Sequence, residues 1–255
     1  MSKHKDRILH AVDMQGTMSV VELSQILGVS DQTIRRVSQP LVQSGELTKV
    51  HGALVSNRNA SDPPFLARMN LNRDAKVAIA RKAIEIIEDG SSIALDTGST
   101  SGFIALALRT RKKLTVVTNS AFIASTLAII PGNKVSMAGT QLRDHDGAAF
   151  DRSAFEVIER MLVDYVVLSA SMVDANKGFL VHEQCEVDIA SAMLRNAECA
   201  IMAVDNSKFL PQDRRPTLRQ PPLQTNDILI SDRKPPEQFN DLLQGIDKRI
   251  AEPQR

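Results

Sequence analysis

A polar and basic face is expected on one helix near the N-terminus. Ile34, Val37 and Leu41 recur at helical spacing and would face a core, after a start that Ser30 can cap. The side chains left on the outside are Gln32, Thr33, Arg35, Arg36 and Gln39. Arginine can bind guanine O6 and N7 or a phosphate, and glutamine can read adenine. We therefore expect this face, together with Ser30, to bind double-stranded operator DNA.

A second helix and a wing would position that face. Ser19 and Glu22 have the spacing of a capping box, which begins a helix, and Gly28 permits a sharp turn after it. The alternating segment 47–52 predicts a strand that sets Lys49 and His51 against the DNA backbone. Residues 1–58 therefore read as a winged helix-turn-helix domain.

Pro40 lies inside the expected DNA-reading helix. Proline lacks an amide hydrogen, and its ring crowds the carbonyl four residues earlier, here that of Arg36. The sequence therefore predicts that this helix kinks or ends early near Pro40.

Other polar residues follow expected strands in the rest of the chain. Small hydroxyl side chains and the first amides of a helix can hold a phosphate, and ligands of parallel sheets bind beyond the carboxyl ends of the strands. The residues that we expect to bind a small-molecule effector are Asp96, Thr97, Gly98, Ser99, Thr100, Thr118, Asn119, Ser120, Gly139 and Lys208. Lys208 would supply a cation for the phosphate.

Strand-like and helix-like segments alternate beyond residue 73. Expected strands span 92–95, 114–117, 134–138, 164–169, 199–204, 227–230 and 246–251. Expected helices span 74–88, 100–108, 121–130, 153–162, 183–197 and 236–244. This alternation predicts an α/β domain over 74–255 with a mainly parallel sheet. The polar, proline-containing stretch before it makes 59–73 the expected linker.

Composition narrows the class of protein. The chain has 255 residues, 43% of them hydrophobic and 24% charged, with a net charge of +1. That balance predicts a soluble folded protein in the cytoplasm, without a membrane segment, and only two cysteines exclude a disulfide framework. His182, Glu183 and Glu186 favour a helix start over a metal site, so we expect neither metal nor cofactor.

The N-terminal motif resembles a known family. Val29–Arg36, followed by Gly45 and by Val50–Ala53, resembles the N-terminal signature of the DeoR family of bacterial sugar-operon regulators. The resemblance implies a transcriptional regulator, most often a repressor of a carbohydrate-metabolism operon. Paired half-sites on the operator would require a homo-oligomer, a dimer or tetramer.

Three loops of the second domain look like the sensor domain of the same family. They are Asp96–Thr100, Thr118–Ser120 and Asp205–Phe209. That sensor domain is similar in fold to ribose-5-phosphate isomerase and responds to a phosphorylated sugar or related metabolite. By this likeness the first loop and Lys208 would hold phosphate, while Asn119 and Asp96 would meet sugar hydroxyls.

Two alternatives come from other classes of protein. A sugar-phosphate isomerase-like enzyme with an accessory N-terminal domain would need a carboxylate base, and Asp96 or Glu183 could be proposed. Nothing in their spacing fixes either one. A scaffold that only oligomerises is the second alternative. We favour the regulator, which is not an enzyme, because it accounts for both the DNA-binding and the effector-binding residues.

Overall fold

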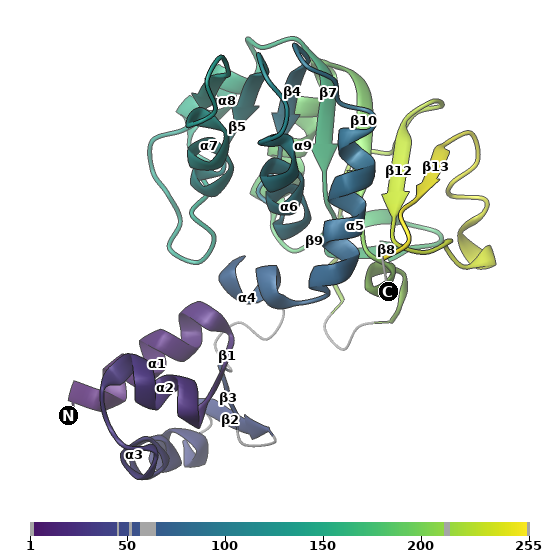
Figure 1. Cartoon of the computed structure of the whole chain (residues 1–255). Helices are drawn as coiled ribbons and strands as arrows, with labels where there is room; N and C mark the ends of the chain where they lie inside the picture. The colour runs from purple at the N-terminus through teal and green to yellow at the C-terminus, as the bar shows by residue number, and fades with distance from the viewer. Residues whose placement is uncertain (1–2, 45, 51–52, 57–64, 212–214, 254–255) are drawn as a thin grey trace. The chain divides into compact units, whose positions relative to one another are not determined.

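The fold is described from a computed structural model that covers residues 3–44, 46–50, 53–56, 65–211 and 215–253. The chain divides into two compact units, Met1–Leu71 and Asn72–Arg255, which are described separately (Figure 1). No helix among the described residues is long and apolar enough to cross a membrane.

The first unit is a winged helix-turn-helix. Its elements are α1 (Lys3–Gln15), β1 (Thr17–Ser19), α2 (Val20–Leu27), α3 (Asp31–Gln43), β2 (Leu47–Val50), β3 (Ala53–Ser56) and α4 (Phe65–Asn70). The strands form an antiparallel sheet in the order β1-β3-β2. Ile8, Leu23, Ile34 and Leu41 form a fully buried core between the helices. The segment 59–73 was expected to be a linker, but residues 65–70 of it form the helix α4.

The helix starts follow the residues that the sequence singles out. Ser19 and Glu22 form the capping box that begins α2, and Gly28 ends it with φ 66°. Ser30 caps α3 by accepting a hydrogen bond from the amide of Thr33 at 3.3 Å. These local caps therefore set where α2 begins and ends and where α3 begins.

The expected early end of α3 at Pro40 is wrong. The helix continues to Gln43, and the amide of Ser44 donates to the carbonyl of Pro40 at 2.9 Å. Pro40 and Arg36 both lie on the exposed side of the helix. The carbonyl of Arg36, which loses its helical partner, is therefore on the side that water can reach.

The second unit has a parallel sheet of seven strands in the order β13-β12-β10-β7-β4-β5-β6. The strands are β4 (Ser92–Leu95), β5 (Thr115–Thr118), β6 (Lys134–Met137), β7 (Val163–Leu168), β10 (Ala197–Ala203), β12 (Ile228–Ser231) and β13 (Asp247–Ile250). A small antiparallel sheet has the order β11-β9-β8, from β8 (Met172–Asp174), β9 (Gly178–Val181) and β11 (Leu218–Arg219). The α/β fold with a mainly parallel sheet is confirmed.

Helices cover both faces of the large sheet (Figure 1). On one face lie α5 (Arg73–Ile84), α6 (Ser99–Leu108) and α7 (Ala121–Ala128). On the other, α8 (Arg152–Ile158) and α9 (Gln184–Arg195) pack together over a core that includes Phe179, Phe209 and Phe239. Because the strands are parallel, their carboxyl ends and the starts of these helices lie at the same end of the sheet, which is called the sheet edge below.

The helix expected over 236–244 is wrong. Only Glu237–Phe239 forms a short 3₁₀ helix, η2. Phe239 and Leu243 are buried four residues apart, and the amide of Leu243 donates to the carbonyl of Phe239 at 3.0 Å. A single turn satisfies that apolar spacing, so the pattern did not require a full helix.

Candidate functional site

The outward face of α3 carries the predicted DNA-binding side chains. Gln32, Arg35, Arg36 and Gln39 are exposed. Neither arginine forms an ion pair with another residue of the described segments. The guanidinium groups are therefore available to an external anion, as phosphate or base recognition requires.

The remaining predicted DNA contacts differ in their surroundings. The hydroxyls of Ser30 and Thr33 lie 3.0 Å apart at the start of α3, so both are engaged in capping the helix. Lys49 is exposed on β2, opposite Leu54 of the antiparallel strand β3. His51 lies outside the described residues.

Asp96 links the carboxyl ends of two neighbouring strands, β4 and β7. Its Oδ1 accepts from the amide of Gly98 at 2.9 Å and from the Ser101 hydroxyl. Its Oδ2 accepts from the amide and the hydroxyl of Ser169, at 2.6 and 2.9 Å. The carboxylate thus holds the loop before α6 in place.

The start of α6 lies close to the end of β7 and has no side-chain cap. Gly98 is the N-cap residue, and a Cβ built on it would lie 1.8 Å from the Ser169 hydroxyl oxygen. Thr97, Ser99 and Thr100 are buried around this turn. A helix start whose first amides lack a capping side chain is where an anion binds most readily.

The loop after β5 is fully buried. Ser120 caps α7, and its amide donates to the Thr118 hydroxyl at 3.1 Å. The Asn119 amide nitrogen donates to the carbonyl of Ala149 at 3.0 Å, which leaves Asn119 Oδ1 buried without a partner. Because the nitrogen faces a carbonyl, the free atom is an acceptor.

The loop between β6 and α8 covers this region and is held by two ion pairs. The Arg143 guanidinium pairs with Asp146 and, at 2.7 Å, with Glu183. It also lies 4.0 Å above the centre of the Phe150 ring. Glu183 and Glu186 form a capping box at the start of α9, so these carboxylates stabilise a helix start.

Asp151 fixes the turn that contains Gly139. Hydrogen bonds from the Ser153 hydroxyl and from the amides of Gln141 and Thr140 hold the pKa of Asp151 well below its ordinary value of 3.8. Gly139 has φ 97°, and a Cβ there would lie 2.3 Å from the Ala149 Cβ. The turn thus packs closely against Ala149, whose carbonyl accepts from Asn119 in the loop after β5.

Replacing Asp151 by asparagine should lower the melting temperature at pH 7. Because folding lowers the pKa of this carboxyl, its stabilisation is complete above the ordinary value of 3.8 and is lost as the pH falls toward the folded pKa. The difference in melting temperature between wild type and Asp151→Asn should therefore narrow below about pH 4. A difference that stays constant from pH 7 to pH 3 would contradict this role.

Asp205 follows β10 and begins the 3₁₀ helix η1 (Asn206–Phe209). Its Oδ1 accepts from the amide of Ser207 at 3.0 Å and from Asn72 at 3.1 Å. Its Oδ2 is buried and has no partner. Lys208, the predicted phosphate ligand, lies half-buried on η1.

Four buried polar atoms in the described part of the second unit have no hydrogen-bond partner, and they lie near the carboxyl ends of the strands. They are Asn119 Oδ1 after β5, Asp205 Oδ2 after β10, Ser231 Oγ at the end of β12, and Gln220 Oε1, whose amide nitrogen donates to the carbonyl of Ser169 after β7. A buried polar atom without a partner costs about 1–3 kcal/mol, so such atoms mark places where a ligand or water completes the hydrogen bonding. A group that meets Asn119 Oδ1, Asp205 Oδ2 or Gln220 Oε1 must donate, as a hydroxyl does, whereas the Ser231 hydroxyl can itself donate or accept.

Family models match both units of the chain. A model of the DeoR C-terminal sensor domain matches residues 71–233, and a model of the DeoR-like helix-turn-helix domain matches residues 5–60. The chain belongs to the DeoR family. The prediction from the motifs around Ile34 and Asp96 is confirmed.

Several DeoR-family regulators are similar over most of the chain. The glycerol-3-phosphate regulon repressor of Escherichia coli (strain K12) is 29% identical over 229 residues, which cover 90% of each protein. The L-fucose operon activator of Haemophilus influenzae is 29% identical over 238 residues, 93% of this chain and 94% of that protein. Among solved structures, the ribose 5-phosphate isomerase A of Methanocaldococcus jannaschii has a TM-score of 0.40 and 19% identity, over 55% of each chain.

Most of the predicted effector residues of this DeoR-family chain lie at the carboxyl ends of neighbouring strands. The sheet order brings the loops after β4 and β5 side by side, and Lys208 follows β10, with β7 between. Ser169 and Gln220 were not singled out from the sequence as site residues. The Gln220 amide nitrogen donates to the Ser169 carbonyl, and the Ser169 hydroxyl donates to Asp96. Gln220 stands in a proline-rich stretch without periodicity, so no local pattern pointed to it.

Proposed function

We propose that this protein binds operator DNA through α3 and represses a carbohydrate-metabolism operon until a phosphorylated sugar binds the second unit. Membership of the DeoR family and the exposed Arg35 and Arg36 support the first part. The observation that carries the second part is the uncapped start of α6 with two buried unpartnered acceptors from the neighbouring strand ends, Asn119 Oδ1 and Gln220 Oε1. The names of the relatives support carbohydrate control, with repressors and one activator among them.

A phosphorylated sugar offers partners to both the donors and the unpartnered acceptors at the carboxyl ends of the strands. Its phosphate accepts from the first amides of α6 and from Lys208, while its hydroxyls donate to atoms such as Asn119 Oδ1. The predicted ligands Thr97, Ser99 and Thr100 surround the phosphate position. Asp96 acts in this proposal by holding the loop, because its oxygens already accept from Gly98, Ser101 and Ser169.

An isomerase activity is less well supported. Both carboxylates that could act as its base are engaged: Asp96 accepts four hydrogen bonds, and Glu183 pairs with Arg143. We propose that the protein is not an enzyme and that it acts in the cytoplasm as a dimer or tetramer on paired half-sites. Turnover of any pentose or hexose phosphate by the purified protein would favour the isomerase instead.

Lys208→Ala should weaken the response to effector and leave the DNA-binding unit intact. Loss of one cation from a phosphate site should reduce affinity about tenfold to a hundredfold, from a charge-assisted hydrogen bond of about 1.5–3 kcal/mol. Thermal shifts of the full chain with a panel of phosphorylated sugars would identify the effector and measure the change.

The matched control for this variant is Lys134→Ala, which removes an exposed lysine from the edge strand β6. Its melting shift with effector and its affinity for operator DNA should equal those of wild type. If Lys208→Ala kept the full shift, Lys208 would have no part in the effector site. If no phosphorylated sugar moved the wild-type melting temperature, the effector class itself would be wrong.

A further inference from the structure

The connection between the two units is short and lies between two helices. In the first unit α4 packs against α1 and ends at Asn70, and in the second unit α5 begins at Arg73. The boundary between the units falls between Leu71 and Asn72. The amide of Leu71 still donates to the carbonyl of Arg68 at 3.3 Å, in the turn that ends α4. Asn72 is therefore the first residue of the chain that belongs to the second unit.

The backbone of Asn72 makes the turn between α4 and α5. Its φ of 49° and ψ of 39° lie in the left-handed region, which asparagine adopts more readily than most residues but still at a cost in free energy. Its carbonyl accepts from the amide of Lys76 at 3.1 Å, which is the first helical bond of α5. Such a conformation persists only where the surroundings hold it. A change of φ and ψ at this one residue would redirect the chain that leads into the first unit.

Two side-chain hydrogen bonds hold Asn72. Its Nδ2 donates to Asp205 Oδ1 at 3.1 Å and to the Ser207 hydroxyl at 3.0 Å. An asparagine at the N-cap position ordinarily caps its own helix, but this side chain makes no cap bond to α5. Asp205 is 2% exposed, and its Oδ1 also accepts from the amide and the hydroxyl of Ser207. We call these three residues, Asn72, Asp205 and Ser207, the Asn72 anchor.

The anchor belongs to the same segment as a predicted effector ligand. Lys208 lies on η1, and its amide donates to the carbonyl of Asp205 at 3.0 Å. Because η1 follows β10 at the sheet edge, a phosphate that draws Lys208 toward it acts on the residues that hold Asn72. The guanidinium of Arg73 lies 5.9 Å from the centre of the Phe103 ring on α6, whose start is the proposed phosphate position. Both elements that offer groups to the phosphate therefore contact the start of α5.

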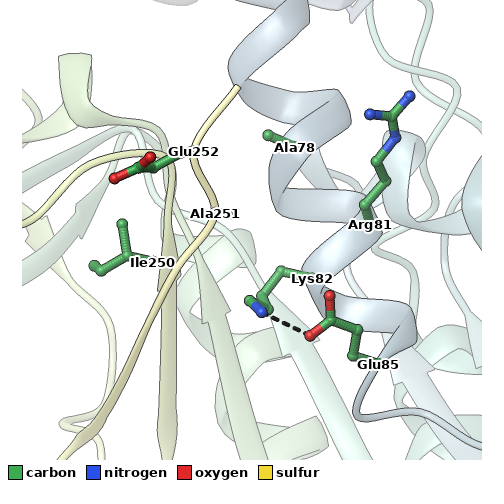
Figure 2. Close-up of a pocket in the computed structure, with 7 residues that line it drawn as sticks. All are labelled: Ala78, Arg81, Lys82, Glu85, Ile250, Ala251 and Glu252. Atoms are coloured by element: carbon green, nitrogen blue, oxygen red, sulfur yellow. Dashed lines mark hydrogen bonds and ion pairs between the residues drawn. The ribbon is translucent and has the colours of Figure 1, made fainter. Parts of the chain in front are cut away.

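The rest of α5 is fixed to the second unit. The helix packs against α6 and β12, and Ile79 and Ala83 are fully buried. Farther along, it borders the chain after β13 across a hollow of about 190 Å³. Figure 2 shows Lys82 there, turned toward Glu85 of its own helix, with which it forms an ion pair of 2.6 Å. Because α5 is held along its length, a movement of η1 alters the backbone of Asn72 more easily than it moves the whole helix.

We propose that the Asn72 anchor couples effector binding to DNA binding. This inference rests on the proposed function, and it makes Asn72 a positioning residue that touches neither the sugar nor the DNA. When a sugar phosphate engages Lys208, η1 moves and the hydrogen bonds from Asn72 to Asp205 and Ser207 change. Asn72 then leaves its left-handed conformation and turns the first unit. Such coupling needs an element with two arrangements that both sites bias, and residues at the ends of elements commonly absorb the change in φ and ψ.

Two substitutions at Asn72 would separate its hydrogen bonds from its backbone conformation. Asn72→Gly removes the side chain and adopts a left-handed φ without strain. Asn72→Asp keeps the shape of the side chain and also tolerates this region, but at pH 7 its carboxylate cannot donate to Asp205. Asn226→Gly is the matched control, because Asn226 also has a left-handed φ, 77°, and lies exposed in the turn before β12.

The measurement is the affinity of each full chain for a DNA fragment that the wild-type protein selects from random sequences. It is made with and without the phosphorylated sugar that raises the wild-type melting temperature most. The ratio of the two affinities should be about fivefold to a hundredfold in wild type and in Asn226→Gly, and about twofold or less in both Asn72 variants. The affinity of these variants for the sugar, and for DNA without sugar, should stay close to that of wild type.

Three results would overturn the inference. A full ratio in both Asn72 variants would do so and would leave the proposed function standing. A loss in one of them alone, or an equal loss in Asn226→Gly, would trace the effect to backbone freedom or to charge repulsion and not to the hydrogen bonds of Asn72. If no phosphorylated sugar changed the operator affinity of wild type, the proposed function would fail, and this inference with it.

Discussion

The double variant Arg35→Ala, Arg36→Ala should lose nearly all specific affinity for operator DNA while its fold stays intact. Both guanidinium groups are exposed on α3, where they pack against nothing in the core that Ile34 and Leu41 form. An arginine contact to a base is worth about 1–3 kcal/mol, so the pair should weaken binding by about a hundredfold or more. The salt dependence should also flatten, because fewer counterions are released.

Fluorescence anisotropy on a fragment that wild-type protein selects from random DNA would measure this loss. Arg152→Ala is the matched control, since it removes an arginine that is exposed on α8 and that pairs, within the described residues, with Glu156 alone. Its DNA affinity should be unchanged. The melting temperature and effector shift of the double variant should equal those of wild type; unchanged affinity in that variant would refute α3 as the reading element.

Gly98→Ala should disrupt the effector site. The added Cβ would lie 1.8 Å from the Ser169 hydroxyl oxygen and 2.8 Å from its Cβ, so the start of α6 or the end of β7 must move. Overpacking of this kind costs about 1–3 kcal/mol. We expect a clearly lower melting temperature and a loss of the effector-induced shift.

A double-mutant cycle with Ser169→Gly would show the cause of that loss. Gly98 has an ordinary φ, so the expected damage comes from the Ser169 side chain and not from backbone strain. Removing that side chain should make Gly98→Ala markedly less destabilising, and the coupling between the two positions should be positive. If the losses of stability of the two single variants simply added up in the double variant, the clash would not involve the Ser169 side chain.

Local signals in the sequence were reliable wherever the partners of a residue lie within a few positions. Ser19 with Glu22, Gly28 and Ser30 each act where their spacing predicted. The expected strand ends also fall within a few residues of the observed ones, because buried β-branched runs and the polar residues after them are local features. The parallel sheet follows from that alternation.

The surroundings of the site residues depended on distant partners and were not predictable. Asp96 was expected to meet sugar hydroxyls, and no local pattern showed that one of its oxygens accepts from Ser169, which is 73 residues away. Gln220 reaches the carbonyl of Ser169 from a segment without periodicity. At Pro40 the local pattern predicted an early end that is not observed, because its exposed position lets α3 continue to Gln43.

Regulation requires that the effector bind the DNA-competent and DNA-free arrangements with different free energies. The most direct measurement is therefore the affinity of the full chain for its selected operator fragment, with and without the phosphorylated sugar that raises its melting temperature most. A change of about fivefold to a hundredfold is predicted, and at a sugar concentration that just saturates wild type it should be clearly smaller in Lys208→Ala. The same operator affinity in both conditions, in a protein that binds both DNA and sugar, would contradict the account.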